Sequence, residues 1–72
     1  MVKPINERRV LRIRESCRKV GLGQSSLYSL ISRGLFPKPF PLVPGGRAVG
    51  WLEDDIDQWI LERKGASERG TL

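Results

Sequence analysis

The sequence predicts a mainly α-helical domain with a small β-hairpin, arranged as a helix-turn-helix followed by a wing. Three observations support this fold class. Apolar residues recur at helical spacing in three separate segments. A glycine ends each of the first two segments, as in two short helices joined by a Gly-containing turn. Four prolines and the pair Gly45-Gly46 precede the third segment, where they exclude a helix and favour a tight turn between strands.

The first two helices follow from short apolar stripes. Residues 10–13 alternate enough to form a short strand, and a two-turn helix then places Ile13, Cys17 and Val20 on one face and stops at Gly21. The second helix is predicted to run from residue 24 to residue 33 and to end at Gly34. Its apolar stripe consists of Leu27, Leu30 and Ile31.

The face of the second helix opposite that stripe is rich in serine and almost uncharged. Ser25, Ser29, Ser32 and Arg33 lie opposite the stripe, and Tyr28 lies on its flank. Short hydrogen-bonding side chains without negative charge are typical of a recognition helix, because they let the backbone approach base edges and phosphates. An ordinary surface helix is the alternative interpretation of the same pattern.

A wing and a third helix complete the predicted domain. The segments PLV and RAVGW flank Gly45-Gly46 and form the predicted hairpin, in which Arg47 is placed to touch a phosphate; a simple connecting turn is the alternative. The segment 51–64 is the clearest helix, with acids in its first turn and Arg63 and Lys64 in its last. Its apolar stripe consists of Leu52, Ile56, Trp59 and Ile60.

Length and residue usage narrow the possible functions. The 72 residues suffice for one domain with a small core, and histidine is absent. The single Cys17 cannot form an internal disulfide or a multi-cysteine metal site, and we interpret it as a small buried hydrophobic residue. We therefore expect no enzyme activity, no cofactor, no metal and no small-molecule substrate. No apolar run approaches the roughly 18 residues that span a bilayer, so we expect a cytoplasmic protein without membrane contact.

Charge is distributed unevenly along the chain. Residues 1–52 carry ten basic and two acidic side chains, a net of +8, whereas residues 53–72 carry three basic and six acidic ones, a net of −3. The two values give the overall charge of +5. A basic body beside an acidic segment favours a polyanion-binding face over a generic basic surface. We expect a flexible basic arm at 1–9, a DNA-binding domain at 10–64 and a disordered tail at 65–72.

These pieces together resemble a known family. The segments LRI, GLGQSSLYSLISRGLFPKP, GGRAVGW and LEDDIDQWI occur in the order and spacing of the AlpA family of small phage and prophage regulators. That family is part of the MerR-like winged-helix group, which also includes excisionases. The resemblance covers about Val10 to Lys64. It implies a three-helix winged fold that binds duplex DNA, with the second helix in the major groove and the hairpin on the backbone.

The family pattern GLSxSTxYxxI falls on Gly21 to Ile31 and identifies candidate contacts. Gly23 stands where the family usually has a capping Ser, and Gln24 where a basic residue is common. The base or phosphate contacts made at Gln24, and with them the target sequence, are therefore expected to differ from those of other family members. By the same resemblance Trp51 is the core tryptophan. The predicted DNA-binding residues are Gln24, Ser25, Ser26, Tyr28, Ser29, Arg33, Lys38 and Arg47.

We interpret the sequence as that of a sequence-specific duplex-DNA-binding protein of a phage or integrative element. It would act as an excisionase, as a transcriptional regulator of integrase or excision genes, or as both. Double-stranded DNA is the expected partner, together with an integrase and neighbouring copies of the protein on DNA. The alternative is a protein-interaction module on a winged-helix scaffold, with the acidic third helix as its docking surface.

Overall fold

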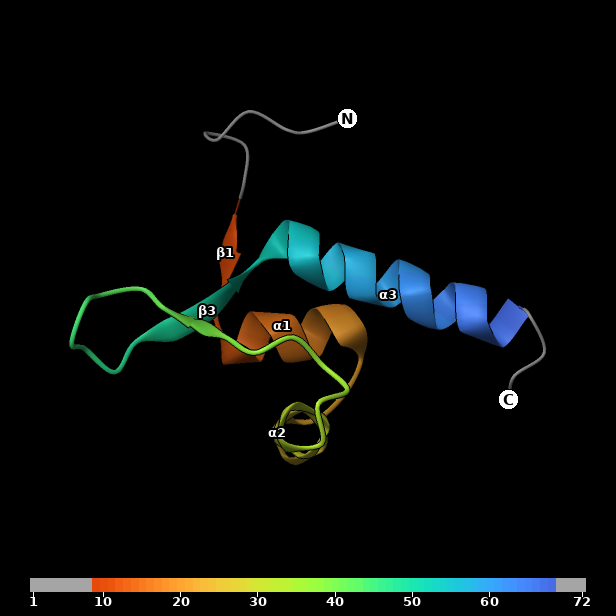
Figure 1. Ribbon diagram of the computed structural model, residues 1–72, viewed down its shortest axis with the longest axis horizontal. Coiled ribbons are helices and arrows are strands. Elements are labelled where there is room, and N and C mark those ends of the chain that lie inside the picture. Colours follow the sequence, from red (N-terminus) through yellow and green to blue (C-terminus); the bar gives the residue numbers. More distant parts are fainter. Residues whose placement is uncertain (1–8, 69–72) are drawn as a thin grey trace.

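The computed structural model describes residues 9–68, which form three helices and a three-stranded sheet (Figure 1). In Figure 1, α1 lies between α2 and α3, and the β2–β3 hairpin extends to one side of the helices. The predicted fold class is confirmed. In chain order the elements are β1 (Val10–Leu11), α1 (Ile13–Val20), α2 (Gln24–Ser32), β2 (Phe40–Pro41), β3 (Val49–Leu52) and α3 (Glu53–Glu68).

The sheet is antiparallel, with β3 in the centre between β1 and β2. Leu11 pairs with Trp51, and Phe40 pairs with Gly50. The strands approach closely at Gly50, where an added Cβ atom would lie 2.8 Å from the Leu11 carbonyl oxygen. The predicted hairpin is therefore present. Strand β1 pairs with β3 as a third strand, a pairing that the sequence pattern did not predict.

Glycines in the left-handed conformation end the first two helices, as predicted. Gly21 has φ of 75°, and its N–H donates to the Cys17 carbonyl oxygen at 2.8 Å. After α2, Gly34 has φ of 72°, and the N–H of Leu35 reaches back to the Leu30 carbonyl at 2.8 Å. This second arrangement is a Schellman motif, which pairs the last helical carbonyls and turns the chain sharply toward the wing.

The third helix departs from the prediction at both ends. Leu52 is the last residue of β3, so the helix begins at Glu53 instead of 51. At the other end α3 continues to Glu68, because a single glycine at position 65 weakens a helix by only about 1 kcal/mol and does not end it. Residues 65–68 are therefore helical, and no basic residue lies in the last turn. The rest of the predicted tail and residues 1–8 of the predicted arm lie outside the described residues.

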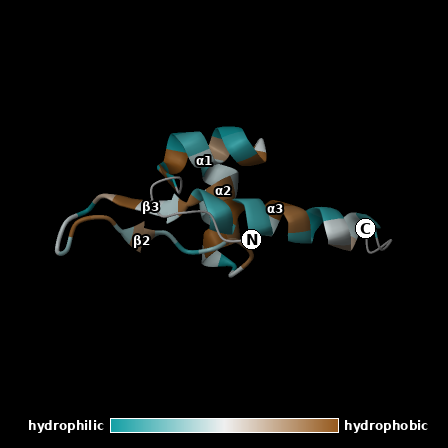
Figure 2. Cartoon of the chain, turned by 90° about the horizontal axis from the view of Figure 1, so that it is seen from above, coloured by the Kyte–Doolittle hydropathy of each residue, from teal (hydrophilic) through white to brown (hydrophobic). Residues whose placement is uncertain are grey.

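A small core joins the sheet to all three helices (Figure 2). Figure 2 shows apolar residues alternating with polar ones along the helices, and further apolar residues in both arms of the hairpin. Trp59, predicted in the core, is only half-buried and packs against the core from α3. Within the described residues no helix combines the length and the apolar character needed to cross a membrane. The buried apolar residues are Leu11, Leu27, Phe36, Trp51 and Ile56.

Candidate nucleic-acid interface

The second helix presents the polar face that its sequence predicts. Leu27 is fully buried, while Leu30 and Ile31 are half-buried on either side of it. The opposite surface therefore exposes only polar side chains, and no acidic residue occurs in the first turn. The exposed predicted contacts on or beside this helix are Gln24, Ser25, Ser26, Tyr28, Ser29 and Arg33.

The start of α2 is open to a ligand. Gly23 precedes the helix in an extended conformation and provides no side-chain cap. The first N–H groups of a helix have no partner inside the helix and carry a partial positive charge. Without a capping side chain or a nearby acid, these groups at Gln24, Ser25 and Ser26 are free to face an anion such as a phosphate.

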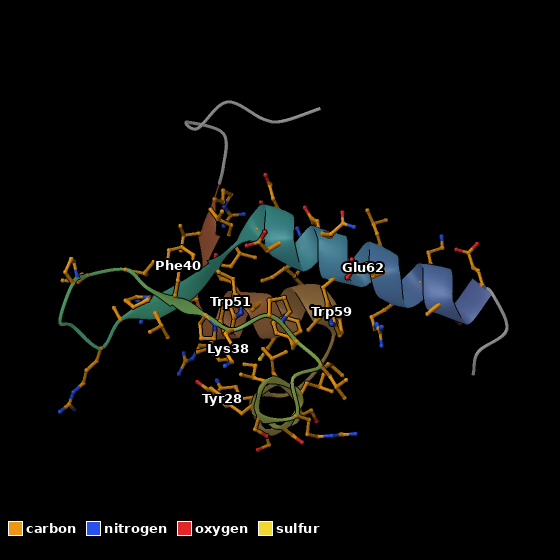
Figure 3. The ribbon with its side chains drawn as sticks, in the orientation of Figure 1. Tyr28, Lys38, Phe40, Trp51, Trp59 and Glu62 are labelled. Atoms are coloured by element: carbon orange, nitrogen blue, oxygen red, sulfur yellow. The ribbon has the colours of Figure 1, made fainter. Side chains whose placement is uncertain are left out.

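Tyr28 extends the polar face toward the wing. Its side chain is 53% exposed and lies on the side of α2 nearer the hairpin (Figure 3). Lys38 follows in the connection to β2 and is exposed as well. Arg33 lies at the other edge of the face, just after the end of α2, and lines a shallow depression with Ser25, Ser26 and Ser29.

The wing tip is a defined turn. The N–H of Gly46 donates to the Val43 carbonyl oxygen at 2.9 Å, and Gly45 has φ of 74°. Proline at the second position and a left-handed glycine at the third are the arrangement typical of a type II turn. Arg47 follows this turn and is exposed. The structure thus places Arg47 at the tip of the hairpin, apart from α2.

Two tryptophans fix the segment that connects α2 with the wing. The Nε1–H group of Trp51 donates to the Pro37 carbonyl at 2.7 Å, and that of Trp59 donates to the Leu35 carbonyl at 2.7 Å. Between them, Phe36 makes edge-on contacts with both rings, at centroid distances of 5.9 and 4.8 Å. Both tryptophans lie between α2 and α3 in Figure 3. They set the position of the hairpin relative to α2, a role that sequence reasoning missed.

Two acidic residues of α3 form ion pairs with α1. Lys19 of α1 donates to Glu53 and to Asp57, each at 2.6 Å. The hydrogen bonds that Lys19 donates to Asp57 and Glu53 raise the pKa of Lys19, and the bond to Glu53 lowers the pKa of that carboxyl group. Two of the clustered acids therefore serve packing between α1 and α3. In contrast, the basic residues of the predicted interface make no ion pair with any residue from 9 to 68: Arg33, Lys38 and Arg47.

Comparison with known proteins identifies the family. Residues 9–64 match the model of the family described as prophage CP4-57 regulatory protein (AlpA). The chain belongs to the AlpA family. The AlpA resemblance of its motifs is thereby confirmed, and the matched range contains every predicted contact residue.

Two curated proteins are similar to this AlpA-family chain. An uncharacterized protein of Enterobacteria phage P4, ORF88, is 36% identical over 92% of this chain and 73% of its own length. The DNA-binding transcriptional activator AlpA of Escherichia coli K12 is 31% identical over 76% of this chain and 84% of its own length. No solved structure matches the chain significantly.

Proposed function

We propose that this protein is a sequence-specific duplex-DNA-binding regulator of a phage or prophage, acting in the cytoplasm. The observation that carries the proposal is the exposed face of α2, which combines short hydroxyl side chains, an open helix start and no negative charge. Membership of the AlpA family supports it, and so does similarity to a protein named as a DNA-binding transcriptional activator.

The mechanism assigns separate tasks to α2 and to the basic residues around it. A helix enters the major groove, where hydroxyl and amide groups donate to and accept from base edges. In α2, Gln24, Ser25 and Ser29 supply such groups, and small serines keep the backbone close to the bases. Arg33, Lys38 and Arg47 bind phosphates and fix the register of the protein without reading sequence.

An architectural role in excision is the second candidate. One winged module buries little surface on DNA, so affinity and specificity benefit from neighbouring copies on adjacent sites. Several bound copies would bend the DNA and help an integrase assemble for excision. Regulation of a promoter and assembly of an excision complex use the same DNA-binding face, so the protein serves either role with the same contacts.

The proposal is tested by selecting bound duplexes from a random DNA pool at near-physiological salt. We expect a defined motif, and copies repeated in one orientation if neighbouring molecules cooperate. A bending assay on the selected site then separates the two roles: straight DNA with altered promoter output would exclude the excisionase role. Weak binding that yields no motif and does not respond to salt would favour the protein-interaction alternative instead.

A further inference from the structure

The first helix exposes two arginines that the predicted contact set does not include. Arg14 and Arg18 are one turn apart on α1, and both are exposed. Residues four apart on a helix lie on the same face, so the two guanidinium groups form one basic ridge. We propose that this ridge, Arg14 with Arg18, binds the DNA phosphate backbone beside the groove that α2 occupies. The inference rests on the proposed function and extends its contact surface to α1.

The other charged side chains of α1 form ion pairs within the described residues, whereas those of the ridge do not. Glu15 accepts a hydrogen bond from the Arg9 guanidinium at 2.9 Å, and Lys19 is held by Glu53 and Asp57. Arg14 and Arg18, by contrast, make no ion pair with any residue in the range 9–68. Two unpaired like charges on one face repel each other, and a polyanion removes that repulsion.

The ridge lies opposite the buried face of α1, because Ser16 is fully buried and, at 100° per residue, Arg14 and Arg18 each lie about 160° around the helix from it. Lys19 marks the α3 side, because its partners are both on α3. At 100° per residue, Arg14 lies about 140° and Arg18 about 100° around the helix from Lys19. Helix α1 packs against both α2 and α3, which lie on the same side of it in Figure 2. The ridge therefore faces away from the core, and in helix-turn-helix proteins the first helix crosses the DNA backbone next to the occupied groove.

Phosphate binding by α1 has a specific signature in the salt dependence of affinity. Each phosphate neutralised contributes about 0.9 to the slope of log K against log salt concentration. Loss of both arginines should lower the slope by about 1.8, which corresponds to roughly 30-fold weaker binding at 0.15 M salt than the parent, converging near 1 M. The selected motif should stay the same, because phosphate contacts position a protein without reading bases.

The test compares three double variants of the full chain with the parent on the selected duplex. Arg14→Gln with Arg18→Gln removes the ridge, and Arg63→Gln with Lys64→Gln removes the same charge from exposed positions on α3. We expect the smaller slope only in the first variant. Arg14→Lys with Arg18→Lys should restore the parent slope, because both charges are kept. Circular dichroism and thermal unfolding of all variants show whether they fold alike.

Three results would overturn the inference. An unchanged slope in the Arg14/Arg18 variant would remove α1 from the interface and leave the proposed function intact. An equal loss in the Arg63/Lys64 control would mean that net charge, not a local contact, sets the affinity. Absence of duplex binding by the parent itself would remove both the inference and the proposed function. If the Gln variant unfolds, the slope of the Lys variant decides: a value below that of the parent contradicts charge-based binding by the ridge.

Discussion

Tyr28, Ser25 and Ser26 are polar residues that the fold does not use. None of their hydroxyl groups makes a hydrogen bond to another residue in the described part of the chain, although all three lie on a well-formed helix. Ser32 differs, because its hydroxyl donates to the Ser29 carbonyl at 2.9 Å. Free hydrogen-bonding groups on a rigid helix are what direct base reading requires.

Replacing Tyr28 with alanine should therefore affect binding and not stability. We expect Tyr28→Ala to change the free energy of unfolding by no more than about 0.5 kcal/mol, as for other exposed sites. Affinity for the selected duplex should fall by about 1–3 kcal/mol. Isothermal titration with the selected duplex and thermal unfolding measure the two quantities. Gln58→Ala, at an exposed position of α3, is the control and should bind as the parent does. Parent-like affinity of Tyr28→Ala would place the reading face elsewhere.

Among residues 9–68, Ser16 is the one buried polar side chain, and its polarity lowers stability. Its side chain is fully buried, and its Oγ atom has no hydrogen-bond partner among the described residues. A buried unpaired hydroxyl costs about 1–3 kcal/mol. Ser16→Ala should therefore raise the free energy of unfolding by about 1 kcal/mol, measured by urea denaturation. Ser67→Ala, at an exposed position, should have no such effect. A loss of stability in Ser16→Ala would show that the hydroxyl does have a partner.

Helix α1 is joined to α3 by charge as well as by apolar packing, at the contact of Lys19 with Glu53 and Asp57. The pKa of Glu53 lies below its ordinary value of 4.5, so the contact stabilises the fold above pH 4.5 and is lost as the pH falls through the lower folded value. The pKa of Lys19 lies above 10.5, so the same contact is present below that pH and is lost as the pH rises through the raised folded value.

Removing one carboxylate should reduce the acid sensitivity of the protein. We expect the parent to lose stability when the pH falls below about 4.5, and Glu53→Gln to lose less over the same interval. At neutral pH, Glu53→Gln should be less stable than the parent, because Lys19 keeps only Asp57. Glu62→Gln removes an exposed acid of the same helix and should follow the parent curve. Identical acid profiles for the parent and Glu53→Gln would contradict the assigned pair.

Sequence reasoning succeeded where the pattern is local. The ends of α1 and α2 follow from Gly21 and Gly34, and the position of the hairpin turn follows from Gly45-Gly46. It failed where partners are distant in sequence. The pairing of β1 with β3 joins residues about 40 positions apart, and the burial of Phe36 depends on two tryptophans from different elements.

In the molecule as a whole, the core holds the two elements of the proposed interface, α2 and the wing, in position relative to each other. The carbonyls of Leu35 and Pro37 are each held by a tryptophan, so the segment between α2 and the wing cannot rotate freely. The acids paired with Lys19 lie on the α3 side, away from α2. The proposed interface therefore consists of α2, which reads bases, and of basic side chains around it, which bind phosphates. The sequence predicts the element that carries each group, but not how those elements lie relative to one another, because that depends on tertiary packing.

In the proposed interface, α2 reads the bases, whereas the wing contacts only the backbone. The most direct test repeats the selection from random duplexes with three proteins: the parent, Ser25→Ala with Ser26→Ala, and Arg47→Ala. We expect the double variant on α2 to lose or change the motif. Arg47→Ala should recover the parent motif with weaker binding and a salt slope lower by about 1. A parent motif unchanged in the α2 variant, or a new motif in Arg47→Ala, would contradict these roles of α2 and the wing.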